Sequence, residues 1–211
     1  MTNAPVTGVL LAGGQSRRMG GGDKGLLPLA GKSMLQHVID RLRPQVGAIV
    51  LNANGDPARF QGFGLPVVAD TIAGQVGPLA GVLAGMRWSL AQAPQRPWVV
   101  TAAGDAPLLP RDLVDRLLAA VAGGAGRIAM AGSNGELHPV IGLWPVALAA
   151  DLEAALGKGV RKVLDWADRH GCVGVDFPPE RLEDIEIDPF FNANTPQELD
   201  QLRRLLAPSR S

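Results

Sequence analysis

The chain has 211 residues and a balanced charge, with 20 Lys plus Arg against 20 Asp plus Glu. This balance excludes the strong positive field of a typical nucleic-acid-binding protein, so any recognition of an anion must be local. The single cysteine, Cys172, excludes an internal disulfide, and no apolar run predicts a membrane-spanning helix. The N-terminus lacks a signal-like segment, so we expect a cytoplasmic protein with one domain over residues 1–211 and a frayed tail at about 208–211.

Taken in chain order, apolar periodicity and turn residues predict strands that alternate with helices. The expected strands are Val6–Leu11, Ala48–Leu51, Pro66–Ala69, Trp98–Ala103, Ile128–Ala131, Val140–Leu143 and Cys172–Val175. The expected helices are Met34–Leu42 after the capping residue Ser33, about Leu79–Leu90 after Pro78, about Arg111–Val121, about Val146–Leu156, about Val160–His170, and a last one opened by Pro196. This order predicts a three-layer α/β domain with a mainly parallel sheet.

A glycine-rich loop follows the first expected strand. Its glycines and cations are Gly13, Gly14, Gly20, Gly21, Gly22, Arg17, Arg18 and Lys24. Glycines allow successive backbone amides to converge on an anion. Arg18 can hold a phosphate through two parallel hydrogen bonds, whereas Lys24 supplies a compact charge, so the loop suits a triphosphate better than a monophosphate. A solvated glycine loop with surface cations is the alternative interpretation.

Two familiar phosphate motifs are excluded by the spacing of this loop. Lys24 is followed by Gly25, so the sequence is not GxxxxGK[ST]. The glycines also do not match the dinucleotide-binding GxGxxG pattern.

Polar residues follow several of the expected strands. Asn52, Asp70 and Asp105 come directly after or at the end of three of them. Ligands in open parallel sheets bind outside the carboxyl ends of the strands, so these side chains are candidates for ligand contact. Asn52 is equally explained as a turn residue, and Gly77 before Pro78 as part of an ordinary helix start.

Asp105 is the candidate metal ligand. Hard cations such as Mg²⁺ are commonly held by one or two carboxylates together with phosphate oxygens and water. Asp105 stands at a strand end, where such a ligand is needed. Its alternative role is a turn-forming aspartate before Pro107.

The last helix has a complete start signal. Thr195, Pro196 and Glu198 form a capping box with Pro at the first helical position. This signal leaves the preceding Asn192 and Asn194 without a structural explanation. His138, Arg161 and Lys162 are weaker candidates for the acceptor side, since a structural histidine and a solvated basic helix start explain them at least as well.

The sequence from Leu11 to Leu27, LAGGQSRRMGGGDKGLL, closely resembles the signature of the molybdenum cofactor guanylyltransferases, a family of the nucleotidyltransferase superfamily. The resemblance continues through Asp105 to the Asn-x-Asn-Thr-Pro segment. It implies a three-layer α/β/α Rossmann-like nucleotidyltransferase fold. The GTP-binding residues that it implies are Leu11, Ala12, Gly13, Gly14, Lys24, Asn52, Asp70, Gly77 and Asp105. It further implies Arg18, Lys24 and Asp105 as catalytic residues, Asp105 as the Mg²⁺ ligand, and Asn192 and Asn194 as residues on the pterin side.

The reaction implied by the resemblance is attack of the terminal phosphate of Mo-molybdopterin on the α-phosphorus of Mg²⁺-bound GTP, with release of pyrophosphate. A phosphate monoester has a second pKa near 6, so this nucleophile needs no general base, which agrees with the lack of a Ser-His-Asp or Cys-His pattern. Transient contact with pterin-delivery or acceptor molybdoenzyme proteins is also implied. A cytidylyltransferase for the pterin or for a sugar or polyol phosphate, and a catalytically silent nucleotide-binding module, are the alternative functions.

Overall fold

Strand β1 (Val6–Leu11) lies inside a seven-stranded sheet and pairs in parallel with β4 (Ala48–Asn52) on one side and β6 (Trp98–Ala103) on the other. The computed structural model describes residues 4–13, 23–72, 77–123, 127–182, 185–193 and 195–206. The order of the sheet is β5-β4-β1-β6-β8-β7-β9. Every strand of this sheet except β8 points in one direction, so the sheet is mainly parallel, as the sequence predicts.

The remaining strands of the large sheet are β5 (Val67–Val68), β7 (Ile128–Ser133), β8 (Glu136–Pro145) and β9 (Cys172–Asp176). Two small hairpins stand apart from it, β2 (Pro28–Leu29) with β3 (Lys32–Ser33), and β10 (Glu180–Leu182) with β11 (Ile185–Ile187). The helices are α1 (Met34–Leu42), α2 (Pro78–Gln92), α3 (Leu113–Ala122), α4 (Ala149–Gly157), α5 (Val163–Ala167) and α6 (Pro196–Leu205).

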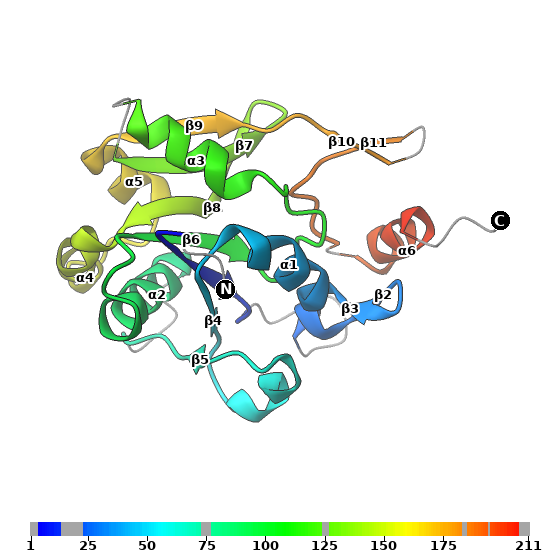
Figure 1. The fold of residues 1–211 in the computed structure, drawn as a ribbon, viewed down its shortest axis with the longest axis horizontal. Coiled ribbons are helices and arrows are strands. Elements are labelled where there is room, and N and C mark those ends of the chain that lie inside the picture. The colour runs from blue at the N-terminus through cyan, green and yellow to red at the C-terminus, as the bar shows by residue number, and fades with distance from the viewer. Residues whose placement is uncertain are drawn as a thin grey trace.

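Helices cover both faces of the sheet (Figure 1), which gives the three layers expected from the sequence. Alternation along the strands divides the core between the faces. In β1, Leu10 packs with the residues of α1 and α3, whereas Val9 packs with those of α2, α4 and α5. Helix α6 lies beside the β2–β3 hairpin, where a smaller apolar cluster joins it to the rest of the molecule (Figure 1). None of the described helices is long and apolar enough to cross a membrane.

Local sequence signals account for several helix starts. The Ser33 hydroxyl accepts a hydrogen bond from the Gln36 amide at 3.1 Å and caps α1. Pro78 occupies the first turn of α2. Thr195 and Glu198 form the expected capping box at α6, with the Thr195 amide donating to Glu198 Oε2 at 2.8 Å.

The bounds of several expected elements differ in the structure, among them the helix expected over Val146–Leu156, which is a 3₁₀ turn, Val146–Leu148, followed by α4. The strand expected at Pro66–Ala69 is only Val67–Val68, α3 begins at Leu113 instead of Arg111, and the helix expected over Val160–His170 is α5 followed by a 3₁₀ turn, Asp168–His170. Strand β8 begins at Glu136, upstream of the expected Val140. Proline has no amide proton to donate to a neighbouring strand. Pro139 is tolerated inside β8 because the pairing of β8 with β7 is irregular there, between Met130 and Gly132 of β7.

Candidate active site

The carboxyl ends of β1, β4 and β6 lie side by side at one edge of the sheet. Leu11 is in register with Asn52 on one side and with Ala103 on the other. The pairing continues past the strands, since the Ala12 amide donates to the Asn52 carbonyl at 2.9 Å and the Gly104 amide donates to the Leu11 carbonyl at 3.1 Å. The loop that starts at Gly13 and the turn that carries Asp105 therefore leave the sheet next to each other.

Lys24 and Asp105 form an ion pair at this edge. Lys24 Nζ donates to Asp105 Oδ2 at 2.8 Å, and the exposed fractions of the two side chains are 9% and 24%. Lys24 belongs to a short 3₁₀ turn, η2 (Lys24–Leu26), that follows the glycine loop. The structure thus brings together a cation and a carboxylate that the sequence predicts as partners in one site.

A close backbone approach makes this pairing possible. A Cβ at Gly25 would lie 2.9 Å from the carbonyl oxygen of Gly104, which is too close for any residue other than glycine without a shift of the backbone. Gly25 and Gly104 are the neighbours of Lys24 and Asp105 in the sequence. Glycine at position 25 therefore lets the η2 turn pack directly on the turn after β6.

Asn192 contacts Asp105 from the C-terminal segment. In the amide orientation that satisfies both residues, its nitrogen donates to the Asp105 carbonyl oxygen and to Oδ1, each at 3.1 Å. One carboxylate oxygen of Asp105 thus faces Lys24 and the other faces Asn192. The segment before α6 closes one side of the site, as far as the described residues show.

A second polar cluster follows β4 and β5. Asp70 accepts hydrogen bonds from Asn52 Nδ2 at 3.0 Å and from Asn54 Nδ2 at 2.8 Å, and its amide donates to Asn54 Oδ1 at 2.9 Å. Asn52 is buried, and its amide oxygen rests against Gly81 of α2, where a Cβ would collide with it. The structure therefore joins Asn52 and Asp70, and it fixes Asn52 between the sheet and α2.

Gly77 lies at the N-cap of α2 with φ of +77°, a backbone conformation that favours glycine. It is exposed, and the Ala80 amide donates to its carbonyl at 3.2 Å. Three other predicted site residues, Gly14, Arg18 and Asn194, lie outside the described residues, as does the loop from 14 to 22.

Two of the weaker candidates, His138 and Arg161, have structural partners. Ser133 donates its only hydroxyl proton to Asp188 Oδ2 at 2.8 Å, so His138 Nε2, 2.7 Å from the Ser133 oxygen, must act as a donor. The His138 ring also packs on Phe190, with the centroids 4.7 Å apart. Arg161 donates to the carbonyls of Leu156 and Val160, each at 2.8 Å, at the end of α4. Lys162 is the N-cap residue of α5.

Sequence reasoning missed one ion pair beside the site. Arg59 Nε lies against Asp23 Oδ2, and the exposed fractions of the two side chains are 28% and 15%. Arg59 comes from a 3₁₀ segment, η4 (Pro57–Phe63), that the apolar pattern did not predict. Asp23 is the neighbour of Lys24 in the sequence, so the pair links η4 to the end of the glycine loop.

The donor set around Asp105 suits a cation that is shared with a ligand. Within the described residues, no group of three His, Cys, Asp or Glu side chains is arranged to hold a metal ion. Mg²⁺ keeps several waters and takes one or two carboxylates together with substrate phosphates. The hard oxygens of Asp105 fit that requirement, while a preformed protein cage is not seen in this part of the chain.

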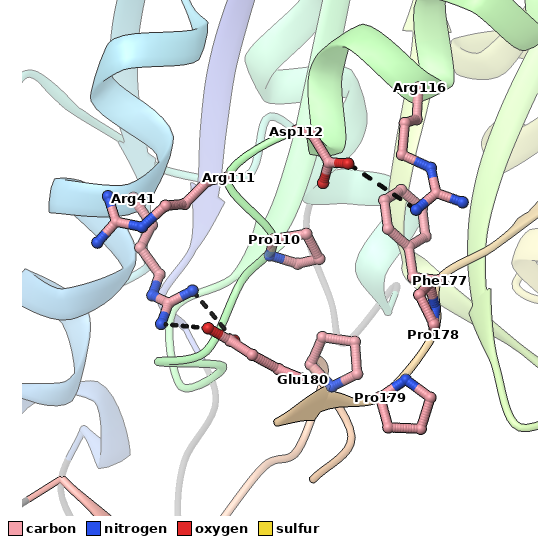
Figure 2. Close-up of a pocket in the computed structure, with 10 residues that line it drawn as sticks. Arg41, Pro110, Arg111, Asp112, Arg116, Phe177, Pro178, Pro179 and Glu180 are labelled. Atoms are coloured by element: carbon pink, nitrogen blue, oxygen red, sulfur yellow. Dashed lines mark hydrogen bonds and ion pairs between the residues drawn. The ribbon is translucent and has the colours of Figure 1, made fainter. Parts of the chain in front are cut away.

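A separate pocket lies between the end of α1 and the start of α3 (Figure 2). Arg41 donates to Glu180 there at 3.1 and 3.2 Å, and the guanidinium of Arg116 lies 4.3 Å from the centre of the Phe177 ring. The pocket is lined by Arg41, Pro110, Arg111, Asp112, Arg116, Phe177, Pro178, Pro179, Glu180 and Pro189. None of the sequence-predicted site residues lines it.

Comparison with protein families gives the class of the protein. The family described as the MobA-like NTP transferase domain matches residues 8–172, from within β1 to the first residue of β9. The fold and this match define an α/β nucleotidyltransferase.

Sequence relatives narrow the class. A "Molybdenum cofactor guanylyltransferase" of Mesorhizobium japonicum is 51% identical over 202 residues, which cover 95% of this chain and 96% of the relative. A second, from Bradyrhizobium sp., is 49% identical over 98% of this chain and 95% of the relative. This chain belongs to the molybdenum cofactor guanylyltransferase family.

Solved structures agree on the fold. The molybdopterin-guanine dinucleotide biosynthesis protein A of Archaeoglobus fulgidus superposes with a TM-score of 0.70 at 24% identity, covering 94% of this chain and 97% of that one. The 4-diphosphocytidyl-2C-methyl-D-erythritol synthase of Anaerococcus prevotii gives the same TM-score of 0.70 at 12% identity, covering 95% and 97%. Both likenesses concern the fold alone.

Proposed function

We propose that this chain transfers GMP from GTP to the terminal phosphate of Mo-molybdopterin, releases pyrophosphate and forms the molybdopterin guanine dinucleotide cofactor. The names of relatives about 50% identical over nearly the whole chain support this assignment. The observation that carries the proposed site is the contact of 2.8 Å between Lys24 Nζ and Asp105 Oδ2 at the carboxyl end of the sheet. It joins the end of the glycine loop to the carboxylate that a metal–triphosphate complex requires.

Lys24 and the loop before it hold the polyphosphate in this proposal. Lys24 is buried near the carboxyl ends of the strands. Backbone amides of a glycine-rich turn bind phosphate oxygens. Arg18 supplies a second cation. Together they stabilise the charge that develops on the departing pyrophosphate, which is where a phosphoryl-transfer enzyme contributes most.

Asp105 is the proposed ligand for Mg²⁺, and the oxygens of its carboxylate are of the kind that this ion prefers. Bound there, Mg²⁺ would neutralise phosphate charge and make the α-phosphorus more electrophilic. Both carboxylate oxygens of Asp105 accept hydrogen bonds, one from Lys24 and one from Asn192. These contacts keep the carboxylate oriented before substrate arrives.

The nucleotide base and ribose are assigned to the cluster after β4 and β5. Leu11, Ala12 and Gly13 line the first turn, while Asn52 and Asp70 follow the neighbouring strands, and Gly77 precedes α2. The hydrogen bond that joins Asn52 to Asp70 supports a preformed site, since an oriented pair costs little reorganisation on binding.

The acceptor approaches from the side of Asn192 and Asn194. Its phosphate is already anionic at neutral pH, so the protein needs to align it and has no proton to remove. The contact of Asn192 with Asp105 supports this assignment, because it places an amide between the C-terminal segment and the proposed metal ligand.

Product analysis tests the function. The purified protein is incubated with Mo-molybdopterin, Mg²⁺ and GTP, CTP, ATP or UTP, and the products are identified by mass spectrometry. We expect the guanine dinucleotide and one pyrophosphate per product with GTP. A cytosine dinucleotide would instead support the cytidylyltransferase alternative, which the fold alone does not exclude, because a cytidyl enzyme shares it. Nucleotide binding with no pyrophosphate release would support a silent module.

The proposal extends to the cellular setting. A cytoplasmic location and transient contact with pterin-delivery or acceptor molybdoenzyme proteins follow from the assigned substrates. Cell fractionation and crosslinking of the tagged protein test them, and recovery of the protein in the membrane fraction would contradict the location.

A further inference from the structure

The Asp23 carboxylate lies beside the proposed phosphate site but takes no part in the local backbone structure. Asp23 is the N-cap residue of η2, yet its side chain makes no capping hydrogen bond. It points instead to Arg59 Nε of η4. Among the described residues this nitrogen makes no well-aligned hydrogen bond, so the contact acts through charge.

Several contacts fix the orientation of the Arg59 guanidinium. Its terminal nitrogens donate to the carbonyls of Asp56 at 2.7 Å and Asn54 at 2.6 Å. Its guanidinium also lies 4.7 Å from the centre of the Phe60 ring, which is fully buried. These contacts fix the cation against Asp23 from the side of the β4 end, where Asn54 also binds Asp70.

Within the described part of the chain, Arg59 is the cation that pairs with Asp23, so its loss would leave the Asp23 carboxylate without that partner. Asp23 directly precedes Lys24, whose own charge is already paired with Asp105. A carboxylate that is only 15% exposed is poorly screened by solvent, and it would repel an incoming polyphosphate. The site therefore contains a charge that works against its proposed ligand and a cation that cancels it.

We propose that Arg59 is a positioning residue for nucleotide binding that neutralises Asp23, and that it sets the affinity of the site for nucleoside triphosphates through this charge. The proposal rests on the proposed function, because it takes the ligand to be a triphosphate at the end of the glycine loop. It assigns to η4 a role in the reaction that no motif in the sequence indicates.

The two substitutions that break the pair separate this role from simple structural support. If the pair only held η4 against the loop, Arg59→Ala and Asp23→Asn would weaken nucleotide binding alike. If the charge matters, the effects have opposite signs. Arg59→Ala leaves Asp23 negative, whereas Asp23→Asn leaves Arg59 free to attract the phosphates.

The test measures the dissociation constant of a fluorescent GTP analogue with Mg²⁺ and the KM for GTP in the full-length protein. We expect Arg59→Ala to weaken binding by about tenfold at low salt, and by less at high salt, since screening reduces the repulsion. Asp23→Asn should bind at least as tightly as the unmodified protein, and the double variant Arg59→Ala/Asp23→Asn should return close to it. Arg59→Lys, which keeps the charge, should also retain binding.

Arg87 provides the matched control. It forms an ion pair with Glu153 on the surface between α2 and α4, remote from the proposed site, and both side chains are partly exposed. Arg87→Ala should leave nucleotide binding unchanged. Thermal unfolding of each variant shows whether a loss of binding reflects a loss of fold.

Two results would overturn the inference. One is a double variant that binds as poorly as Arg59→Ala, and the other is equal weakening by Asp23→Asn and Arg59→Ala. If Arg59→Ala does not fold, the affinities of Arg59→Lys and Asp23→Asn for the nucleotide still show whether the charge of Asp23 weakens binding. Failure of the unmodified protein to bind GTP at all is a different outcome, because it would reject the proposed function.

Discussion

Lys24 and Asp105 are 81 positions apart in the chain, yet Nζ of one and Oδ2 of the other are 2.8 Å apart. In this pair the ammonium group and the carboxylate neutralise each other. In the proposed reaction, a metal–triphosphate complex would replace this contact by two others, Lys24 with phosphate and Asp105 with the metal. This exchange is the basis of the first two predictions.

Replacing Asp105 by Asn should remove the proposed metal ligand and keep the shape of the side chain. We expect kcat to fall by at least about 100-fold, because an amide oxygen carries no net charge to hold Mg²⁺ against the phosphates. The melting temperature should stay within a few degrees, since the side chain is 24% exposed. Pyrophosphate release checks the prediction, and near-normal turnover would reject the role of Asp105.

Replacing Lys24 by Ala should lower turnover severely, because the substitution removes a cation that the proposal places on the phosphates. The side chain is buried, and its loss leaves Asp105 without its cation. We expect a higher KM for GTP together with a lower kcat, and a cost of about 1–2 kcal/mol in the free energy of unfolding, because the carboxylate still reaches water. Urea unfolding and steady-state kinetics measure the two effects. Turnover close to that of the unmodified protein would contradict the assignment.

Gly13→Ala tests the choice of base. A Cβ at this position would lie 3.9 Å from the Ala53 Cα and from the Asn54 amide, which is ordinary contact, so the substitution should leave stability nearly unchanged. We expect the added methyl group to reduce the room for a purine and to shift the ratio of kcat/KM for GTP over CTP by about tenfold toward CTP. Competition between the two nucleotides measures this ratio. The same ratio in both proteins would show that Gly13 does not select the base.

Asn192→Ala should impair turnover more than nucleotide binding. The substitution removes the amide that donates to the Asp105 carbonyl and to Oδ1. Because the carboxylate loses one of two orienting contacts, we expect kcat to fall by about tenfold with little change in the dissociation constant for GTP. Leu137→Ala, which replaces an exposed side chain of β8, is a suitable control. A loss of GTP binding equal to the loss of kcat would contradict a role on the acceptor side.

The lone cysteine should be unreactive in the folded protein at neutral pH. Burial, with a smaller contribution from the Asp168 carboxylate, raises the pKa of the Cys172 thiol to about 11. The thiol therefore stays protonated and reacts slowly at pH 8, whereas denaturant should speed its reaction with a disulfide reagent. The stability that this shift supplies is present below the unfolded pKa near 9 and is lost as the pH rises toward 11. Fast labelling of the native protein at pH 8 would contradict the prediction.

Strong local signals made much of the fold predictable. Continuous apolar runs correctly predicted β1 and β6 as buried strands, and the cap at Ser33 and the box at Thr195 correctly marked the starts of α1 and α6. The hairpin of β10 and β11 was missed, because its strands are three residues long and pair mainly with each other. Such strands depend on contacts that no local pattern encodes.

The residues of the candidate site also fall into those that the sequence predicted and those that it did not. Residues that follow strands, such as Asn52 and Asp105, were predicted as candidates because the sheet geometry gathers strand ends at one edge. Arg59 was missed because it comes from a short 3₁₀ segment, and its partner is 36 positions earlier in the chain. The residue that could have drawn attention to this region is Asn54. It follows the same strand as Asn52 and hydrogen-bonds to the backbone and the side chain of Asp70.

Helix α2 packs against the sheet through glycine at two successive turns, Gly81 on Asn52 and Gly85 on Val9, with no space for a methyl group at either position. A helix seated this closely cannot slide or roll over its strands without steric collision. Any rearrangement that accompanies turnover must then occur in the connections at the rim, while helix and sheet behave as one rigid platform. Amide exchange should report this division, with α2 equally protected in the free and nucleotide-bound protein.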